Sequence, residues 1–438
     1  MKKCKSLLGL VVPLIAVLLS GCGKESTTEE HEKLWVTAYA TTIYDPVRRE
    51  LYAEFENTQP DVKIDYLPNQ YGEYYNKLTL QLASGKAPDV VFTENIFLPR
   101  HARAGDFISL DPFIQADKDF RLSDFHDVGL KMYQFEGEQY AMPGNLAVFV
   151  MFYNKDIFDA EDIAPPDETW DWDKLLEVSK KLTKRDSEGN VTRFAISPSR
   201  HYSIFMMQNG AKVYNDDYAK CIIDNEAAKE AIQFYAELAD KHNVTPNLSQ
   251  LKSYQTVDLF QNGKCAMLIT GRWSILGYRN IKDFEWDVAP LPHGKKRATL
   301  LASHGWAVSK TCKNPKLAWE FVKYITGPAG ARRVVDMGDC NPALNTLDDY
   351  FINEATAKWP KEKNDNQVYV DSLAYAYTDP FLHPWVPIAE IEDKFVEKME
   401  EYREGEKTLD VALREFQDMM NKLIDERRPK APLSTSKD

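Results

Sequence analysis

The chain begins its folded part with alternating strand and helix patterns, and this alternation limits the fold more than any other feature. An apolar run at 34–39 is followed by helical spacing of apolar residues over 45–55. Apolar residues then alternate with polar ones at 62–66, a second helical pattern covers 75–82, and a short apolar run covers 90–92. Strand, helix, strand, helix and strand at this spacing predict an α/β unit with a largely parallel sheet.

A second α/β region is predicted from a strand pattern that begins near residue 149. Helical patterns follow at 172–182 and 227–238, and two long amphipathic helices at 388–403 and 409–424 close the chain. A chain of 438 residues is long enough for two or more structural units, each with a core of its own.

The stretch NGKCAMLITGRWSI, residues 262–275, reads as a buried strand with an abrupt end. The apolar run from Cys265 to Ile269 predicts the strand, and Gly271 breaks it. Arg272 and Trp273 follow at once. A tryptophan in this place either completes a hydrophobic core or waits at the strand end for a ligand to stack on it.

Charge and scattered residue types exclude several classes of function. The net charge of −13 argues against a nucleic-acid partner, because such partners need a clustered basic face. The eight histidines lie far apart in the sequence and predict no metal site. No nucleophile elbow, H-E-x-x-H segment or phosphate-binding loop is present, so we predict no enzyme and no cofactor.

Four cysteines lie within the part of the chain that is expected to fold. They are far apart and form no C-x-x-C pair, which leaves little support for zinc or redox chemistry. Outside the cytoplasm four cysteines can pair in three ways, and buried free thiols are the alternative. The sequence leaves both open for Cys221, Cys265, Cys312 and Cys340.

The N-terminus has the pattern of a secretory signal peptide. Lys2, Lys3 and Lys5 precede an apolar stretch that is too short for a comfortable membrane span. The stretch ends in Leu-Ser-Gly-Cys, which resembles the bacterial lipobox, and this resemblance implies that Cys22 is cleaved and lipidated. We therefore predict a signal peptide at 1–21, a polar tether at 22–33, and a protein that acyl chains hold to a membrane in the cell envelope.

Several later segments, in order, resemble the ABC-transporter extracellular solute-binding proteins of family 1, the carbohydrate-type lipoproteins. LTLQLASGKAPDVV, MFYNKD, PPDETWDWDKLL and WDVAPLP are similar to motifs of that family. NGKCAMLITGRWS is similar to its SGKAAMxxxGSWxI segment, with arginine in place of the usual small residue before the tryptophan. The resemblance covers nearly all of the chain that follows Cys22.

The resemblance implies a two-lobe fold of the periplasmic-binding-protein type, type II, with a hinge and a ligand cleft between the lobes. We place lobe one at 34–144 plus 300–348 and lobe two at 145–299 plus 349–438. The implied function is capture of a mono- or oligosaccharide and its delivery to the permease subunits of an ABC transporter. The protein would work as a monomer on the outer face of the cytoplasmic membrane or in the periplasm, without a catalytic step.

A sugar presents C–H faces that pack on aromatic rings and hydroxyls that need donors and acceptors around the ring edge. Ligands in open α/β sheets bind outside the carboxyl ends of the strands. Aromatic, carboxylate, amide and arginine side chains near predicted strand ends or in the loop before the penultimate helix are therefore the candidate ligand-binding residues: Tyr39, Tyr44, Glu94, Asn95, Asn145, Arg272, Trp273, His304, Trp306 and Trp385.

Most of these candidates have a second interpretation. The aromatic ones fit equally into a core or, for Trp385, against a lobe surface, and Asn145 fits the backbone of the hinge. The resemblance implies that Trp273 faces the solute. Arg272 would bind hydroxyls or pair with an acidic sugar such as a uronate, and its alternative is a salt bridge to a surface carboxylate.

Three other functions compete with transport of a sugar. An extracellular carbohydrate-active enzyme needs two carboxylates that face each other across the scissile bond, and no local arrangement singles out such a pair. A surface adhesin would use an open face instead of a closing cleft. A binding protein for a non-sugar solute such as glycerol phosphate is the alternative within the binding class.

Overall fold

The predicted strand–helix unit forms one end of the protein in the computed structural model, which describes residues 31–197, 201–247, 250, 256–355, 359 and 365–428. Its strands pair in parallel, with β1 between the other two. The strand β1 takes up the last two residues of the segment predicted as a tether. The elements are β1 (Glu32–Tyr39), α1 (Tyr44–Thr58), β2 (Val62–Asn69), α2 (Tyr71–Ala83) and β3 (Val90–Glu94).

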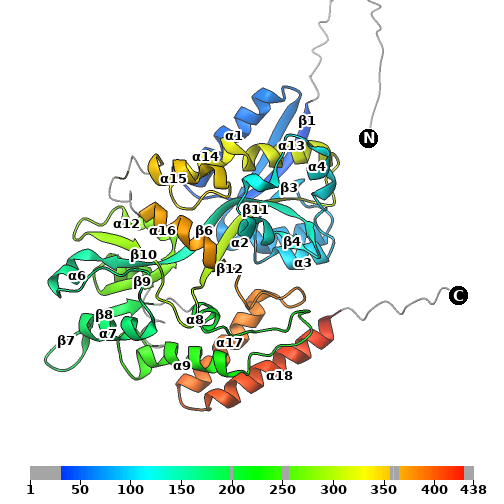
Figure 1. Cartoon of the computed structure of the whole chain (residues 1–438). Helices are drawn as coiled ribbons and strands as arrows, with labels where there is room; N and C mark the ends of the chain where they lie inside the picture. Colours follow the sequence, from blue (N-terminus) through cyan, green and yellow to red (C-terminus); the bar gives the residue numbers. More distant parts are fainter. Residues whose placement is uncertain are drawn as a thin grey trace, which may run out of the picture.

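Two long strands run through the middle of the molecule and connect its two halves. They are β6 (Ala141–Asn154) and β11 (Thr299–Val308), and they pair antiparallel with an irregularity between His304 and Gly305. Figure 1 shows them between an upper half, with α1 and β1, and a lower half, with α17 (Ile388–Arg403) and α18 (Leu409–Arg427).

The lower half contains the second predicted α/β region. Its strand β9 (Cys265–Gly271) is buried along its whole length, as the sequence predicts, and lies between β6 and β8 in the sheet. The other elements are α6 (Lys155–Ala160), α7 (Trp172–Leu182), β7 (Lys184–Arg185), β8 (Val191–Ser197), α8 (Tyr202–Gln208), α9 (Glu226–Asp240), α11 (Thr256–Gln261), α12 (Ile275–Tyr278), β10 (Trp286–Ala289), α17 (Ile388–Arg403) and α18 (Leu409–Arg427).

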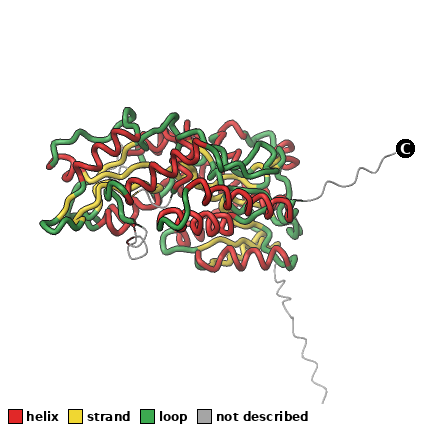
Figure 2. The backbone as a smooth tube through the Cα atoms, turned by 90° about the horizontal axis from the view of Figure 1, so that it is seen from below, coloured by secondary structure: helices red, strands yellow, loops and turns green. Residues whose placement is uncertain are grey.

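Further helices and short strands complete the upper half and the region between the halves. Seen from below, the strands lie among helices (Figure 2). These elements are α3 (Leu98–Arg103), α4 (Asp111–Ala116), α5 (Asp127–Lys131), β4 (Gln134–Phe135), β5 (Glu138–Gln139), α13 (Pro315–Thr326), α14 (Pro328–Met337), α15 (Asp348–Asn353), α16 (Asp365–Ser372) and β12 (Ala376–Tyr377).

Two hydrophobic cores lie on either side of the long strands, and β6 contributes to both. Val148, Val150 and Phe152 belong to the core that also holds β1 and α13. Phe149 and Met151 belong to the core that also holds α9 and α18. Successive side chains of a strand point to opposite faces, so one strand can serve two cores. The observed architecture confirms the predicted α/β class, while the lobe bounds given above stay a prediction.

The structure shows the state of the four cysteines, whereas the predicted signal peptide lies outside the residues that it describes. All four cysteines are free thiols; Cys221, Cys265 and Cys340 are buried, as the second interpretation expects, and Cys312 is half-buried. Within the described ranges no helix is both long enough and apolar enough to cross a membrane. The predicted signal peptide and the predicted lipidation site Cys22 lie outside the described residues.

Candidate functional site

A cavity of about 600 Å³ lies between the two halves, beside the long strands. We call it the central cleft. This size falls within the range of about 300–1,000 Å³ that is common for small-molecule sites. Residues from the ends of β1 and β3, from β6 and β11, and from the segment after β9 line it: Tyr39, Thr41, Ile43, Tyr44, Tyr71, Glu94, Asn95, Ile96, Asn145, Ala147, Phe149, His201, Trp273, Leu276, Leu300, Leu301, Ala302, Ser303, His304, Asp339, Cys340 and Asp379.

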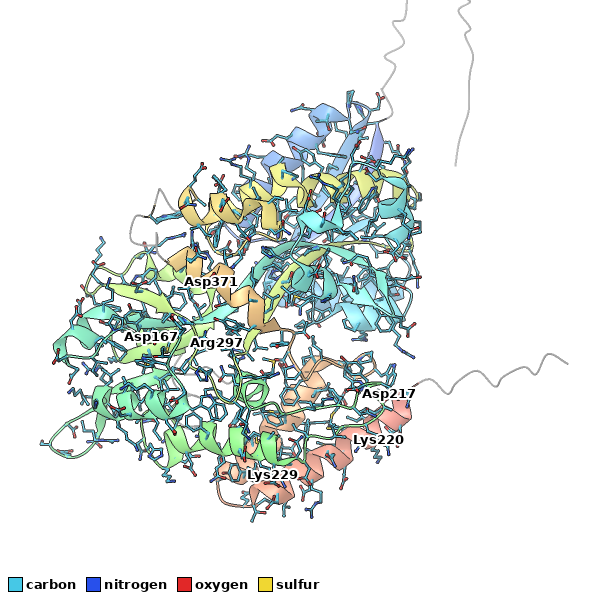
Figure 3. The ribbon with its side chains drawn as sticks, viewed as in Figure 1. Asp167, Asp217, Lys220, Lys229, Arg297 and Asp371 are labelled. Carbon is cyan, nitrogen blue, oxygen red and sulfur yellow. The ribbon has the colours of Figure 1, made fainter. Side chains whose placement is uncertain are left out.

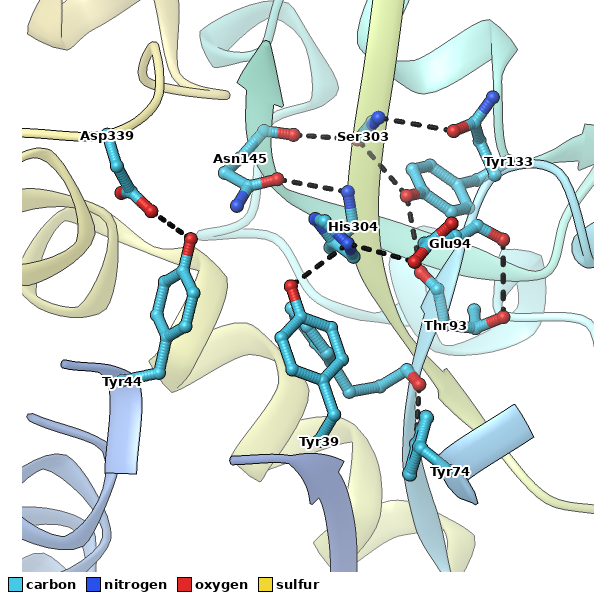
Figure 4. A network of polar contacts seen from close by, with 12 residues as sticks. Tyr39, Tyr44, Tyr74, Thr93, Glu94, Tyr133, Asn145, Ser303, His304 and Asp339 are labelled. Carbon is cyan, nitrogen blue, oxygen red and sulfur yellow. Dashed lines mark hydrogen bonds and ion pairs between the residues drawn. The ribbon is translucent and has the colours of Figure 1, made fainter. Parts of the chain in front are cut away.

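A chain of polar contacts covers the wall of the central cleft in the upper half (Figure 4). The hydroxyl of Tyr39 lies 3.1 Å from Nε2 of His304. The same nitrogen lies 3.4 Å from Oε1 of Glu94. Burial alone would raise the pKa of Glu94, but its contacts with His304 and two tyrosines outweigh burial and lower the pKa. Glu94 is therefore a carboxylate at neutral pH.

A tyrosine and a second carboxylate form another polar contact beside these residues. The hydroxyl of Tyr44 donates a hydrogen bond to Oδ2 of Asp339 (Figure 4). Asp339 is only 3% exposed. Burial and the neighbouring carboxylate raise the pKa of Tyr44 well above its ordinary value, so the phenol stays protonated as the donor.

The two predicted asparagines hold the crossing strand in place. Oδ1 of Asn145 accepts a hydrogen bond of 2.9 Å from the backbone N–H of His304. Oδ1 of Asn95 accepts one of 3.1 Å from the backbone N–H of Ser303. Both asparagines also line the central cleft. They therefore fix the position of β11 there with their side-chain oxygens, which leaves the amide NH₂ groups as the donors that can face a ligand.

Trp273 forms an exposed aromatic surface on the wall in the lower half. It is 42% exposed and meets Phe149 edge to face at 5.1 Å between ring centroids. Its indole lies against Gly271, where an added Cβ would come within 2.0 Å of the ring. The glycine that ends the strand pattern is thus what lets the indole lie back on the cleft wall. His201 also packs on Phe149, with 4.6 Å between ring centroids, and burial lowers the pKa of His201 to about 4.

The structure does not bring Arg272 or Trp306 to the central cleft. Arg272 is fully buried, with its guanidinium carbon 4.7 Å and 4.6 Å from the ring centroids of Phe351 and Tyr369. Arg272 and Trp273 begin a 3₁₀ turn, in which consecutive side chains diverge by about 120° because there are three residues per turn. Trp306 is 5% exposed and packs on Phe92.

Trp385 lies at a neighbouring cavity of about 370 Å³, which shares Asn95 with the central cleft. The guanidinium carbons of Arg103 and Arg428 lie 5.2 Å and 5.1 Å from its ring centroid. Trp385 is thus a cation-bound ring at a side cavity and is not part of the central cleft.

Sequence reasoning missed several residues that line the central cleft. Tyr71 is 55% exposed and begins α2, two residues after the end of β2, so the strand-end rule that found Glu94 could have found it. Asp339 and Asp379 lie in irregular segments with no periodic signal. Away from the central cleft Lys229, labelled in Figure 3, pairs with Asp224 at 2.9 Å and with Asp410 at 2.7 Å. The described residues hold no group of His, Cys, Asp and Glu placed to bind a metal.

Two α/β halves, joined by crossing strands around a cleft of polar and aromatic side chains, define a two-lobe solute-binding protein. The family model of the bacterial extracellular solute-binding proteins matches residues 40–332. The chain belongs to this family, which confirms the resemblance found in the sequence and places the chain among binding proteins instead of enzymes.

Relatives and solved structures agree with this assignment. The chain is 24% identical to the maltodextrin-binding protein MdxE of Bacillus subtilis, over 74% of this chain and 76% of the relative. It is 29% identical to the melibiose/raffinose/stachyose-binding protein MelE of the same organism, over 86% and 87%. A substrate-binding protein from Listeria monocytogenes, solved in complex with cycloalternan, shares the fold with a TM-score of 0.79 and 24% identity, over 90% of this chain and 99% of that one.

Proposed function

We propose that this protein is a lipid-anchored receptor that captures an oligosaccharide in the central cleft and delivers it to the permease of an ABC transporter. Lobe one, at 34–144 plus 300–348, and lobe two, at 145–299 plus 349–438, would close on the ligand. Closure is a hinge motion in which the closed form binds the ligand best.

The observation that carries this proposal is an exposed indole across the cleft from hydrogen-bonding groups. Trp273 offers a flat apolar surface for a sugar face. Tyr39, Glu94 and His304 offer donors and acceptors for hydroxyls on the other wall. Two relatives bear the names of oligosaccharide-binding proteins, and the Listeria structure holds an oligosaccharide, which supports the choice of solute.

The proposal is tested by thermal unfolding of purified protein in the presence of maltotriose, raffinose, stachyose, arabinotriose, glucose and glycerol 3-phosphate. A ligand that binds only the folded state raises the melting temperature. Isothermal titration calorimetry on each probe that raises it then gives the affinity. A chain that responds to none of the sugars would contradict the proposed function.

We expect closure without turnover. Small-angle scattering should show a smaller radius of gyration once a binding oligosaccharide is added, because the two halves approach each other. Chromatography of the released ligand should recover it intact. Cleaved product that accumulates in proportion to the protein would instead support a carbohydrate-active enzyme.

Replacement of Cys22 with alanine should release the protein from the membrane fraction. The thiol of Cys22 is the predicted site of lipid attachment, and stable anchoring needs two acyl chains or more. Metabolic labelling with a fatty acid checks the loss of the lipid. The matched control is Cys221→Ala, because Cys221 is buried inside the folded protein. Unchanged labelling of Cys22→Ala would remove the lipobox interpretation.

A further inference from the structure

Two carboxylates, Asp339 and Glu94, line the upper wall of the central cleft, and among the described residues one oxygen of Asp339 has no hydrogen-bond partner. Oδ2 of Asp339 accepts from Tyr44, and Oδ1 has no partner although the side chain is buried. Oε1 of Glu94 pairs with Nε2 of His304 at 3.4 Å, and Glu94 also lines the central cleft. In Figure 4 the two carboxylates lie on opposite sides of Asn145 and His304. Buried acceptors without partners are costly unless a ligand supplies donors.

Arg48, a cation near these carboxylates, lies behind the upper wall of the central cleft and does not line it. The guanidinium carbon of Arg48 lies 4.4 Å from the ring centroid of Phe92 and 5.1 Å from that of Tyr44. The same guanidinium donates a hydrogen bond to the backbone oxygen of Tyr39. Among the described residues that line the central cleft there is no lysine or arginine.

The opposite wall adds a third carboxyl group. Asp379 accepts hydrogen bonds of 3.2 Å from the hydroxyl of Ser203 and 2.9 Å from the backbone N–H of Phe381. Burial raises the pKa of Asp379. A ligand in the central cleft therefore meets carboxyl groups from both halves, and Glu94 at least carries a full negative charge at neutral pH.

We infer that the central cleft selects oligosaccharides without acidic groups, and that Asp339 and Glu94 are the residues that reject uronates and sugar phosphates. This specificity rests on the proposed function. The unpartnered oxygen of Asp339 and the carboxylate of Glu94 accept hydrogen bonds from sugar hydroxyls, or from an ammonium group on an amino sugar. A carboxylate or phosphate on the ligand would add a like charge inside a site of low dielectric, which is strongly unfavourable.

The test compares ligands that differ in one group. Each neutral probe that binds, with maltotriose and raffinose tried first, is oxidised at a primary hydroxyl to its uronic form, and both forms are titrated by calorimetry at the same ionic strength. We expect the neutral form to bind at least about tenfold more tightly, since like charges at close range cost several kcal/mol in a binding site. Glycerol 3-phosphate should not bind.

Asp339→Asn separates the role of charge from the role of shape. The amide keeps the size of the side chain and an oxygen for the Tyr44 hydroxyl, but its NH₂ group replaces the oxygen that accepts from the ligand, so the affinity for the neutral probe should fall as well. The preference for neutral over oxidised probe should narrow by about tenfold or more, since the like charge is gone. The matched control is Asp336→Asn, because Asp336 accepts a hydrogen bond from the hydroxyl of Tyr350 in the same way but lies outside the central cleft.

The outcomes distinguish the two proposals. Equal affinity of the native protein for neutral and oxidised probes overturns the inference and leaves oligosaccharide capture intact. A preference that Asp339→Asn and Asp336→Asn change equally overturns the role of Asp339. Absence of binding by any saccharide, neutral or acidic, overturns the proposed function and the inference together.

Discussion

Replacement of Trp273 with alanine is expected to weaken oligosaccharide binding by about 1–3 kcal/mol, or roughly 5- to 150-fold in Kd, while the unliganded protein stays nearly as stable as before. The indole is 42% exposed without ligand, so its removal leaves little new cavity in the fold. A sugar face that covers the ring would remove that surface from water only in the complex. Calorimetric titration and denaturant unfolding of the same preparation measure the two quantities.

Two further variants make the result specific to the position of the ring. Trp306→Ala removes a tryptophan that is 5% exposed and packs in the core, so it should destabilise the fold by about 3–5 kcal/mol. Gly271→Ala keeps the indole but forces it off the wall, because the new methyl group would lie 2.0 Å from the ring. It should weaken binding although Trp273 is still present. Normal binding by Trp273→Ala would end the stacking role.

Replacement of Arg272 with alanine is expected to affect folding instead of binding, and to lower the free energy of unfolding by about 2–5 kcal/mol. The side chain is fully buried, and its guanidinium lies against Phe351 and Tyr369, which are themselves fully buried. Truncation leaves a cavity between α15 and α16 and removes both cation–π contacts. Denaturant unfolding gives the change in the free energy of unfolding.

Arg272→Met is the partner variant, because methionine refills much of the space without the charge. It should recover part of the stability that alanine loses. The folded fraction of either variant should bind oligosaccharide with an affinity near that of the native protein, since Arg272 does not line the central cleft. A stable Arg272→Ala variant that fails to bind oligosaccharide would contradict this prediction and would indicate that Arg272 takes part in ligand binding.

Periodic patterns in the sequence predicted the elements of the fold well where one face of an element is buried. The predicted helix at 388–403 has the bounds of α17, and the apolar run that starts at Cys265 is strand β9. Both elements pack a regular stripe or a whole strand into a core, and this is the property that apolar spacing reports. Family motifs supplied the arrangement of the halves, which periodicity alone does not contain.

The candidate site was harder to predict because its contacts join distant segments. Arg272 and Trp273 are neighbours in the chain, yet one lies in the core and the other on the cleft wall, since a 3₁₀ turn separates their directions. The rings that cover Arg272 come from α15 and α16. Asp339 accepts a hydrogen bond from Tyr44, which lies 295 residues earlier in the chain. No local pattern encodes either pairing.

The double role of β6 has a consequence for how the protein unfolds. All fourteen residues of this strand are buried, and from Val148 to Tyr153 its side chains alternate between two cores, the first of which joins β1 of the upper half to β9 and β10 of the lower half. Neither half can release β6 without exposing its own apolar interior to water, so loss of one core removes a wall of the other. We therefore expect the two halves to be thermodynamically coupled and to unfold as one cooperative unit.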